Sequence, residues 1–303
     1  MSSDAELRFI VAADDVGRVD RAVARHFPDV GRRRLSELFA AGAVRVGGRV
    51  ARKGDRVDVG AEVVLAQAPL SRADLPPTPD PAVAARLVVL YRDDDVVAID
   101  KPPGVPSQPL RAGELGTAAN GIIALHPECA DVADDPRDGG LVHRLDIGTS
   151  GVLVAARNRD AWEALRAAFG SGAVDKEYVA LTFGAPVATE CDAPLAQRGK
   201  KVVVDLADGL PAHTRWKVER AIGPWRLVRC QATTGRMHQV RAHLAHCGAP
   251  IAGDVLYGGP PVDGLIGFFL HAAVVRFPGR SGQITIEAPL PVDRREVLAQ
   301  VGG

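Results

Sequence analysis

The sequence has few cysteines and no long apolar run, and both absences exclude whole classes of protein. Its four cysteines, Cys129, Cys191, Cys230 and Cys247, show no C-x-x-C spacing, so we expect neither a disulfide framework nor a zinc module. No apolar stretch approaches the ~18 residues needed to span a bilayer, and the first residues lack the positive and apolar regions of a signal peptide. We therefore expect a soluble, cytoplasmic protein without a metal site.

An excess of charge of either sign is also missing. The 303 residues include 37 Lys and Arg against 37 Asp and Glu, a formal net charge of +0. This balance argues at first against a nucleic-acid partner, because phosphate binding needs clustered positive charge. The zero is a cancellation between regions, however. Residues 18–56 carry 11 basic and 4 acidic side chains, whereas residues 71–142 carry 6 basic and 12 acidic ones.

Proline clusters at one place in the chain. Residues 66–81 contain five of the 22 prolines, and proline lacks the backbone N–H that helices and sheets use. We interpret residues 67–81 as an extended linker. It divides the chain into an N-terminal domain, residues 1–66, and a larger domain, residues 82–303.

The N-terminal domain has the pattern of a small α+β fold. Apolar residues recur at helical spacing over residues 17–27 and 31–42, and Gly47-Gly48 predicts a hairpin. Two short helices followed by a small sheet, with an arginine-rich second helix and G-x-V-x-V-x-G over residues 42–48, resemble the S4-like RNA-binding domain. The resemblance implies RNA phosphate contact through Arg32, Arg33, Arg34, Arg45, Arg49, Arg52 and Lys53. A generic domain with a solvated basic face is the alternative.

The larger domain alternates strand patterns with a few helices, without the βαβ rhythm of a doubly wound fold. Helices are expected from Asn158, as the N-cap, to Phe169 with Gly170 as the end, and over residues 237–247. Strands are expected over residues 86–91, 96–100, 176–184, 213–222, 225–233, 268–277 and 283–290. This order predicts an α+β fold with a mostly antiparallel sheet.

One segment, residues 140–158, concentrates polar side chains between two apolar strands. These polar residues are His143, Arg144, Asp146, Thr149 and Ser150. A turn of this kind presents side chains from a rigid scaffold. Asp146 stands between the apolar Leu145 and Ile147, so we expect it to be partly desolvated and to need a cation to stay ionised. From the spacing alone, an aspartate that caps its own loop is the favoured interpretation.

The helix expected over residues 237–247 supplies a candidate cation. Arg241 falls on its apolar face, which consists of Met237, Val240, Leu244 and Cys247. A buried arginine must be paired, and both a structural pair with any carboxylate and a pair with Asp146 are open at this point. His243 and His246 have a spacing that suits a metal ion, but no second group of ligands is evident. We expect these two residues and His238 on the helix surface or at its ends.

Several segments, in order along the chain, resemble the RluA-type RNA pseudouridine synthases. Residues 143–151, HRLDIGTSG, are similar to the family's HRLDxxTSG, which contains the catalytic aspartate. The other similar segments are residues 100–109 (the family's NKPxG loop), 175–184 (KxYxA), 233–259 (TGRTHQIR to GDxxYG) and 269–272 (LHA). The resemblance covers about residues 86–290 and implies the pseudouridine synthase catalytic fold, a mixed sheet with a central cleft.

The resemblance also implies a role for individual residues. Asp146 matches the catalytic carboxylate, Arg241 the arginine that pairs with it, and Tyr178 the tyrosine that stacks on the target uracil. Contact with the substrate is implied for Arg144, His143, Thr149, Leu270, Arg236 and His238. Two departures from the family pattern, Ser107-Gln108 for Val-His and Met237 for threonine, lie near the implied RNA path and bear on which RNA is bound.

The implied reaction breaks the N1–C1′ bond of a uridine, rotates the uracil and rejoins it through C5. It needs an ionised carboxylate, a dry pocket and a flipped base, and neither cofactor nor metal. The sequence has no G-x-G-x-x-G, no G-x-x-x-x-G-K-[ST] and no metal cluster. We predict a monomeric isomerase acting on structured RNA, large-subunit rRNA being favoured over tRNA. The alternatives are a non-catalytic RNA-binding or ribosome-assembly protein, and a metal-dependent hydrolase that uses His238, His243 and Asp254.

Overall fold

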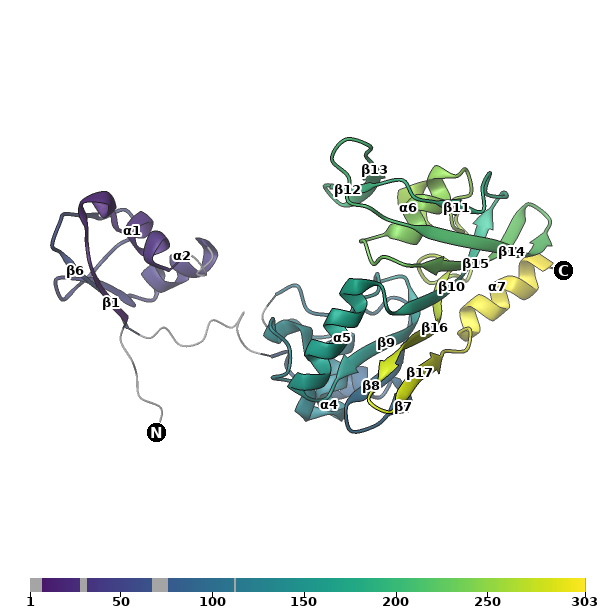
Figure 1. Cartoon of the computed structure of the whole chain (residues 1–303), viewed down its shortest axis with the longest axis horizontal. Helices are drawn as coiled ribbons and strands as arrows, with labels where there is room; N and C mark the ends of the chain where they lie inside the picture. Colours follow the sequence, from purple (N-terminus) through teal and green to yellow (C-terminus); the bar gives the residue numbers. More distant parts are fainter. Residues whose placement is uncertain (1–6, 28–31, 67–75, 112, 303) are drawn as a thin grey trace. The chain divides into compact units, whose positions relative to one another are not determined.

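The computed structural model describes residues 7–27, 32–66, 76–111 and 113–302, which form two separate units (Figure 1). The division falls between residues 72 and 73, and each unit has its own apolar core. In the described ranges, no helix combines the length and the apolar character that crossing a membrane requires.

The N-terminal unit is a small α+β fold with a four-stranded sheet in the order β1-β6-β3-β4 and a separate β2-β5 pair. Its elements are β1 (Leu7–Ile10), η1 (Ala13–Asp15), β2 (Gly17–Arg18), α1 (Val19–His26), α2 (Arg32–Ala40), β3 (Val44–Val46), β4 (Arg49–Val50), β5 (Arg56–Val57) and β6 (Glu62–Leu65). The expected helices and hairpin are present. Gly47 and Gly48 both have positive φ, 54° and 80°, which the two-residue hairpin turn requires.

Strand β1 was not predicted from the sequence. It pairs antiparallel with β6, and its four residues are mostly exposed. A short edge strand of this kind shows no alternation of buried and exposed residues, so the sequence carries no signal for it.

The larger unit is built on a nine-stranded sheet in the order β11-β14-β15-β10-β16-β9-β8-β7, with β17 also paired to β16. The sheet strands are β7 (Val88–Arg92), β8 (Val96–Lys101), β9 (Ser150–Ala156), β10 (Asp175–Phe183), β11 (Glu190–Cys191), β14 (Thr214–Ile222), β15 (Trp225–Ala232), β16 (Leu270–Gly279) and β17 (Gly282–Glu287). Its pairs are antiparallel except for β16 with β9. The predicted α+β class with a mostly antiparallel mixed sheet is confirmed.

The remaining elements of the larger unit are helices and one separate hairpin. They are α3 (Pro81–Ala84), α4 (Ala118–Leu125), η3 (Pro127–Cys129), η4 (Pro136–Asp138), α5 (Arg159–Ser171), the hairpin β12 (Leu195–Arg198) and β13 (Lys201–Val204), α6 (Gln239–His246), η5 (Val255–Tyr257) and α7 (Val292–Gly302). Helix α3 begins inside the segment interpreted as a linker, because Pro81 occupies the first helical turn behind the N-cap Asp80. Residues 67–75 of that segment lie outside the described residues.

Helices cover both faces of strands β8 and β9 (Figure 1). Val96 and Ala98 pack in the same core cluster as α5, whereas Val97 and Ile99 share a cluster with α4. Consecutive residues of a strand point to opposite faces, so a strand covered on both sides is buried along its whole length, as all seven residues of β9 are.

The parallel pairing of β16 with β9 joins two distant segments at the centre of the sheet. Ser150 lies opposite His271, and Gly151 lies opposite Ala272. A Cβ at Gly151 would lie 2.2 Å from the carbonyl oxygen of Ala272, so only glycine fits there. The Ser150 hydroxyl and His271 Nδ1 are 2.9 Å apart. The loop that precedes β9, which contains Asp146, is therefore anchored beside β16.

Two helix boundaries differ from the sequence prediction. Helix α5 begins behind Asn158 as expected, but it ends at Gly172 (φ 79°) rather than at Gly170. Helix α6 begins at Gln239 rather than at residue 237, because His238 has φ 54° and ψ 17°. A left-handed residue cannot belong to a right-handed helix.

Candidate active site

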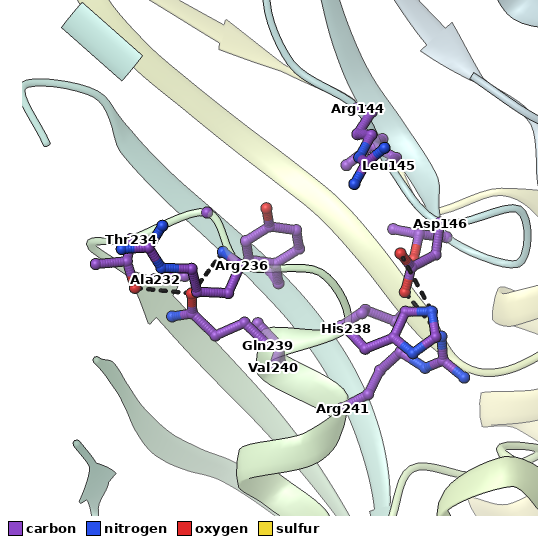
Figure 2. Close-up of a pocket in the computed structure, with 14 residues that line it drawn as sticks. Arg144, Leu145, Asp146, Ala232, Thr234, Arg236, His238, Gln239, Val240 and Arg241 are labelled. Carbon is purple, nitrogen blue, oxygen red and sulfur yellow. Dashed lines mark hydrogen bonds and ion pairs between the residues drawn. The ribbon is translucent and has the colours of Figure 1, made fainter. Parts of the chain in front are cut away.

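A pocket in the larger unit is lined by the loop before β9, by β10 and β15, and by the start of α6 (Figure 2). It brings together all three residues predicted to be catalytic, Asp146, Tyr178 and Arg241. Five of the six residues predicted to bind substrate also line it, namely Arg144, Thr149, Leu270, Arg236 and His238. These residues come from four separate stretches of the chain, so the fold assembles the pocket.

Asp146 and Arg241 form an ion pair at this pocket (Figure 2). Arg241 Nη1 donates to Asp146 Oδ2 at 2.8 Å. The Asp146 side chain is 23% exposed and that of Arg241 only 6%. Both side chains line the pocket, and the carboxylate is the more exposed of the two. The expectation that apolar neighbours desolvate Asp146 holds only on one side, because Leu145 is buried but Ile147 is 56% exposed.

Asp254 holds the other edge of the Arg241 guanidinium. Arg241 Nε donates to Oδ2 at 2.7 Å and Nη2 donates to Oδ1 at 2.9 Å. The guanidinium also lies over the rings of Phe268, at 4.1 Å, and Tyr257, at 5.0 Å. Burial lowers the pKa of Arg241, but the bond to Asp254 and the charges of Asp146 and Asp254 outweigh it and raise the pKa overall. The cation is therefore fixed in charge and orientation.

Asp254 was not predicted as a partner of Arg241. The one signal in the sequence is that an arginine has five N–H donors, more than a single carboxylate can accept. A buried arginine therefore implies at least one further acceptor, but the spacing of residues along the chain does not say which.

His238 reaches the pocket through an unusual backbone conformation. It is the single non-glycine residue with positive φ in the described part of the chain. Its Nε2 lies 3.9 Å from Asp146 Oδ1, and its Nδ1 lies 3.0 Å from the Tyr257 hydroxyl. Burial lowers the pKa of His238, although the negative charge of Asp146 opposes this shift. Strained backbone of this kind is concentrated at functional sites.

Tyr178 and Thr149 support the same pocket from the sheet and from the loop. Burial, followed by the negative charge of Asp146, raises the pKa of Tyr178 above its usual value, so it is a neutral phenol at neutral pH. The Thr149 N–H donates to the Asp146 carbonyl at 3.0 Å. Leu270 is buried at the start of β16 and adds an apolar wall.

Two exposed arginines, Arg144 and Arg236, lie at the rim of the pocket. Arg236 Nε donates to the Pro211 carbonyl at 3.0 Å. Cations at the opening of a pocket are suited to phosphate groups that remain in solvent while a base enters.

His143 is the predicted substrate-binding residue that the structure does not bring to the pocket. Its ring stacks on Phe169, with centroids 4.7 Å apart, and its Nε2 accepts the Val154 N–H at 3.1 Å. Burial lowers the pKa of His143 to about 3, so the ring is neutral. These contacts direct the side chain into the core between β9 and α5, away from the pocket.

His243 corrects the expectation of a surface position. It is fully buried, with Nδ1 2.9 Å from Thr214 Oγ1 and Nε2 2.9 Å from the Ala193 carbonyl, so its polar atoms are satisfied inside. His246 is exposed. Over the described ranges, no three His, Cys, Asp or Glu side chains are grouped as a metal ion would require.

The candidate RNA-binding residues of the N-terminal unit are exposed where their side chains are described. These are Arg45, Arg49, Arg52 and Lys53. Lys53 Nζ donates to Ser36 Oγ at 2.6 Å. The side chains of Arg32, Arg33 and Arg34, at the start of α2, lie outside the described part of the structure.

The pocket presents one carboxylate paired with a buried arginine, as the resemblance to the pseudouridine synthases implies. Solved structures agree with this class. The structure titled Human RNA Pseudouridylate Synthase Domain Containing 4 is 25% identical with a TM-score of 0.59, and the match covers 73% of this chain and 95% of that one. Human RNA Pseudouridylate Synthase Domain Containing 1 has a TM-score of 0.53 and shares the fold at 23% identity.

Comparison with known sequences identifies the family of the chain. The family described as RNA pseudouridylate synthase matches residues 95–246. Ribosomal large subunit pseudouridine synthase D of Xanthomonas campestris is 35% identical over 98% of this chain and 93% of its own length. Ribosomal large subunit pseudouridine synthase C of Salmonella typhi is 33% identical over 95% and 94%. The chain belongs to the RNA pseudouridylate synthase family, and its predicted activity as an isomerase of uridine in RNA is confirmed.

Proposed function

We propose that the protein isomerises specific uridines of large-subunit ribosomal RNA, with Asp146 as the catalytic carboxylate. Relatives that match nearly the whole chain are named as ribosomal large subunit pseudouridine synthases, which supports rRNA over tRNA. The observation that supports the catalytic role is the Asp146–Arg241 pair in the pocket, in which the carboxylate is 23% exposed and the arginine only 6%. We further propose that the protein acts in the cytoplasm as a monomer.

The chemistry follows from a carboxylate that is paired with a buried arginine. One oxygen of Asp146 accepts the Arg241 N–H, which leaves the other free to meet the ribose of a flipped uridine. An ionised carboxylate there either attacks C1′ or accepts the proton of C2′, and both routes release the uracil from N1. The uracil then rotates, bonds through C5 and loses its C5 proton. Leu270 and Tyr178 supply the walls against which a planar base packs.

The N-terminal unit is proposed as an S4-like RNA-binding domain, residues 1–66, joined to the catalytic domain, residues 82–303. Its exposed Arg45, Arg49 and Arg52 show no ion pair within the described ranges. Unpaired, exposed arginines suit RNA phosphates, which contribute affinity and not sequence specificity.

The test of the catalytic role is Asp146→Asn, which keeps the side-chain shape and removes the charge. We expect no release of tritium from RNA that contains 5-tritiated uridine, with RNA affinity within about threefold of wild type, because the change removes the reacting group and leaves the phosphate contacts. Asp160→Asn, at an exposed position on α5, is the matched control and should keep full activity. Substantial turnover by purified Asp146→Asn would overturn the assignment.

The proposed RNA target is tested in cells. A pseudouridine map of large-subunit rRNA and of tRNA, with and without this gene, should lose sites in the rRNA alone. Loss confined to tRNA would contradict the rRNA proposal while leaving the activity intact.

A further inference from the structure

Arg294, on the C-terminal helix α7, is the largest fully buried side chain in the described structure. A charge in this position is costly to bury, and its Nε has no hydrogen-bond partner among the described residues. Nη1 donates to Asp293 Oδ2 at 2.8 Å. The pocket does not include Arg294, so the chemistry described above gives no reason for a buried guanidinium here.

The remaining contacts of Arg294 lead to the active site. Its Nη2 donates to the carbonyl oxygens of Gly148 and Phe268, both at 2.8 Å. Gly148 follows Asp146 by two residues, and the Phe268 ring packs on the Arg241 guanidinium at 4.1 Å. One nitrogen of Arg294 therefore holds the backbone beside each member of the Asp146–Arg241 pair.

Gly148 and Phe268 are also in direct contact. A Cβ at Gly148 would lie 2.7 Å from the Phe268 ring, so the two segments approach as closely as glycine permits. The shared donor of Arg294 thus bridges segments that already touch.

The loop around Asp146 has no regular structure, yet each of its carbonyls from residue 145 to residue 148 accepts a hydrogen bond. The Leu145 carbonyl accepts from Ser107 Oγ at 2.8 Å, and the Leu145 N–H donates back to that hydroxyl at 2.9 Å. The Asp146 carbonyl accepts from the Thr149 N–H at 3.0 Å, and that of residue 147 from the Gly104 N–H at 2.8 Å. The Gly148 carbonyl accepts from Arg294 Nη2 at 2.8 Å. Ser107 and Arg294 therefore hold the two ends of this loop.

We propose that Arg294 and Ser107 are positioning residues for the Asp146–Arg241 pair. Arg294 fixes the C-terminal side of the loop together with the segment of Phe268, and buried Ser107 fixes the N-terminal side. This inference rests on the proposed catalytic role of Asp146. It makes the C-terminal helix, which lies beyond the matched family region of residues 95–246, part of the active-site framework.

The decisive measurement is the single-turnover rate constant at saturating enzyme, read as tritium release from RNA with 5-tritiated uridine. With enzyme in excess, this constant does not depend on the folded fraction of the preparation, so a purely structural role would leave it unchanged. A misplacement of about 1 Å can reduce a rate by about 100-fold. We expect Arg294→Met to lower the constant about 30- to 100-fold, with RNA affinity within about threefold of wild type.

Three variants complete the experiment. Arg295→Met removes the adjacent exposed arginine of the same helix and should match wild type. Arg294→Lys keeps the charge and a donor, and its single-turnover rate constant should be at least about tenfold higher than that of Arg294→Met. Ser107→Ala tests the other end of the loop with a small change, and it should lower the rate constant about tenfold. Combined with Arg294→Met, its effect should be less than additive, because both act through one loop.

The outcomes separate this inference from the proposed function. If Asp146→Asn is inactive while Ser107→Ala and every folded Arg294 variant keep the wild-type rate constant, the positioning role is wrong and the catalytic assignment stands. If Arg294→Met does not fold, Ser107→Ala alone decides: a rate constant within about twofold of wild type refutes the positioning role. If Asp146→Asn is active, the proposed function fails, and the inference fails with it.

Discussion

One arginine of the larger unit and three arginines of the N-terminal unit lie in opposite environments. In the larger unit, Arg241 is 6% exposed, bonded to two carboxylates and covered by two aromatic rings. In the N-terminal unit, Arg45, Arg49 and Arg52 are exposed, and no ion pair is found for them within the described ranges. A buried cation acts through its position, so the substitution of this one residue should have a large effect. Exposed cations act through their summed charge, which salt screens.

The first prediction tests the buried side of this comparison and carries the largest expected effect. Arg241→Met leaves Asp254 buried and Asp146 without its cation, and breaking such a pair on one side destabilises a protein by about 3–5 kcal/mol. We expect the free energy of unfolding in urea to fall by about this amount, and tritium release to be lost. Tryptophan fluorescence measures the unfolding of the larger unit alone, because all three tryptophans, Trp162, Trp216 and Trp225, lie there.

Arg220→Met is the control for this prediction, because Arg220 is an exposed arginine of the same unit. It should change the free energy of unfolding by no more than about 0.5 kcal/mol. A stable and fully active Arg241→Met enzyme would contradict the pairing as the basis of the site.

The second prediction concerns pH and two histidines of the larger unit, the partly buried His143 and the buried His271. Burial lowers the pKa of His143 to about 3 and that of His271 to about 4, below the ordinary value of about 6.5. Between about pH 6.5 and pH 4, the unfolded chain therefore binds protons at these two side chains that the folded unit does not, so their contribution to stability falls as the pH falls. Together they should lower the free energy of unfolding, measured by tryptophan fluorescence, by about 4 kcal/mol from about pH 6.5 to about pH 4.5. Asp100, whose pKa burial raises to about 6, acts in the opposite direction over the same range.

His271→Gln separates the contribution of one histidine. Glutamine does not titrate, so the variant should lose about 2 kcal/mol less stability than wild type over the same pH range, although its stability at neutral pH will be lower than that of wild type. The exposed His246→Gln is the control and should leave the pH dependence unchanged; His126 would not serve, because it is buried and contacts Glu128. If the free energy of unfolding changed equally with pH in His271→Gln and in wild type, the assignment of this titration to His271 would be contradicted.

Much of the framework could be predicted from periodicity, because buried faces follow the repeat of a helix or a strand. Arg241 was placed inward by this argument, and its pair with Asp146 is present. The same reasoning failed for His243, which was expected at the surface. A buried polar side chain is stable when strands bring it partners, here Thr214 and Ala193, and periodicity carries no information on partners that are distant in sequence.

The contacts that set the geometry of the site were beyond sequence reasoning for the same physical reason. Asp254, Phe268 and Arg294 act through packing across separate segments. The left-handed backbone of His238 could not be predicted from its residue type, since such a conformation is uncommon outside glycine. Long-range packing maintains strain of this kind.

The last prediction has the smallest effect per residue and tests the exposed side of the comparison. Substitution of Arg45, Arg49 and Arg52 together by Gln should weaken RNA binding and reduce the slope of log affinity against log salt by up to about 3, at about 0.9 for each phosphate that is no longer neutralised. Arg45→Gln alone should reduce it by no more than about 1. The single-turnover rate constant at saturating enzyme should not change, because none of the three residues lines the pocket.

Arg18→Gln is the control, since Arg18 is already paired with Asp20. An unchanged salt slope in the triple variant would show that these exposed charges do not bind the RNA, and the contrast between a positional cation in one unit and summed charge in the other would then disappear.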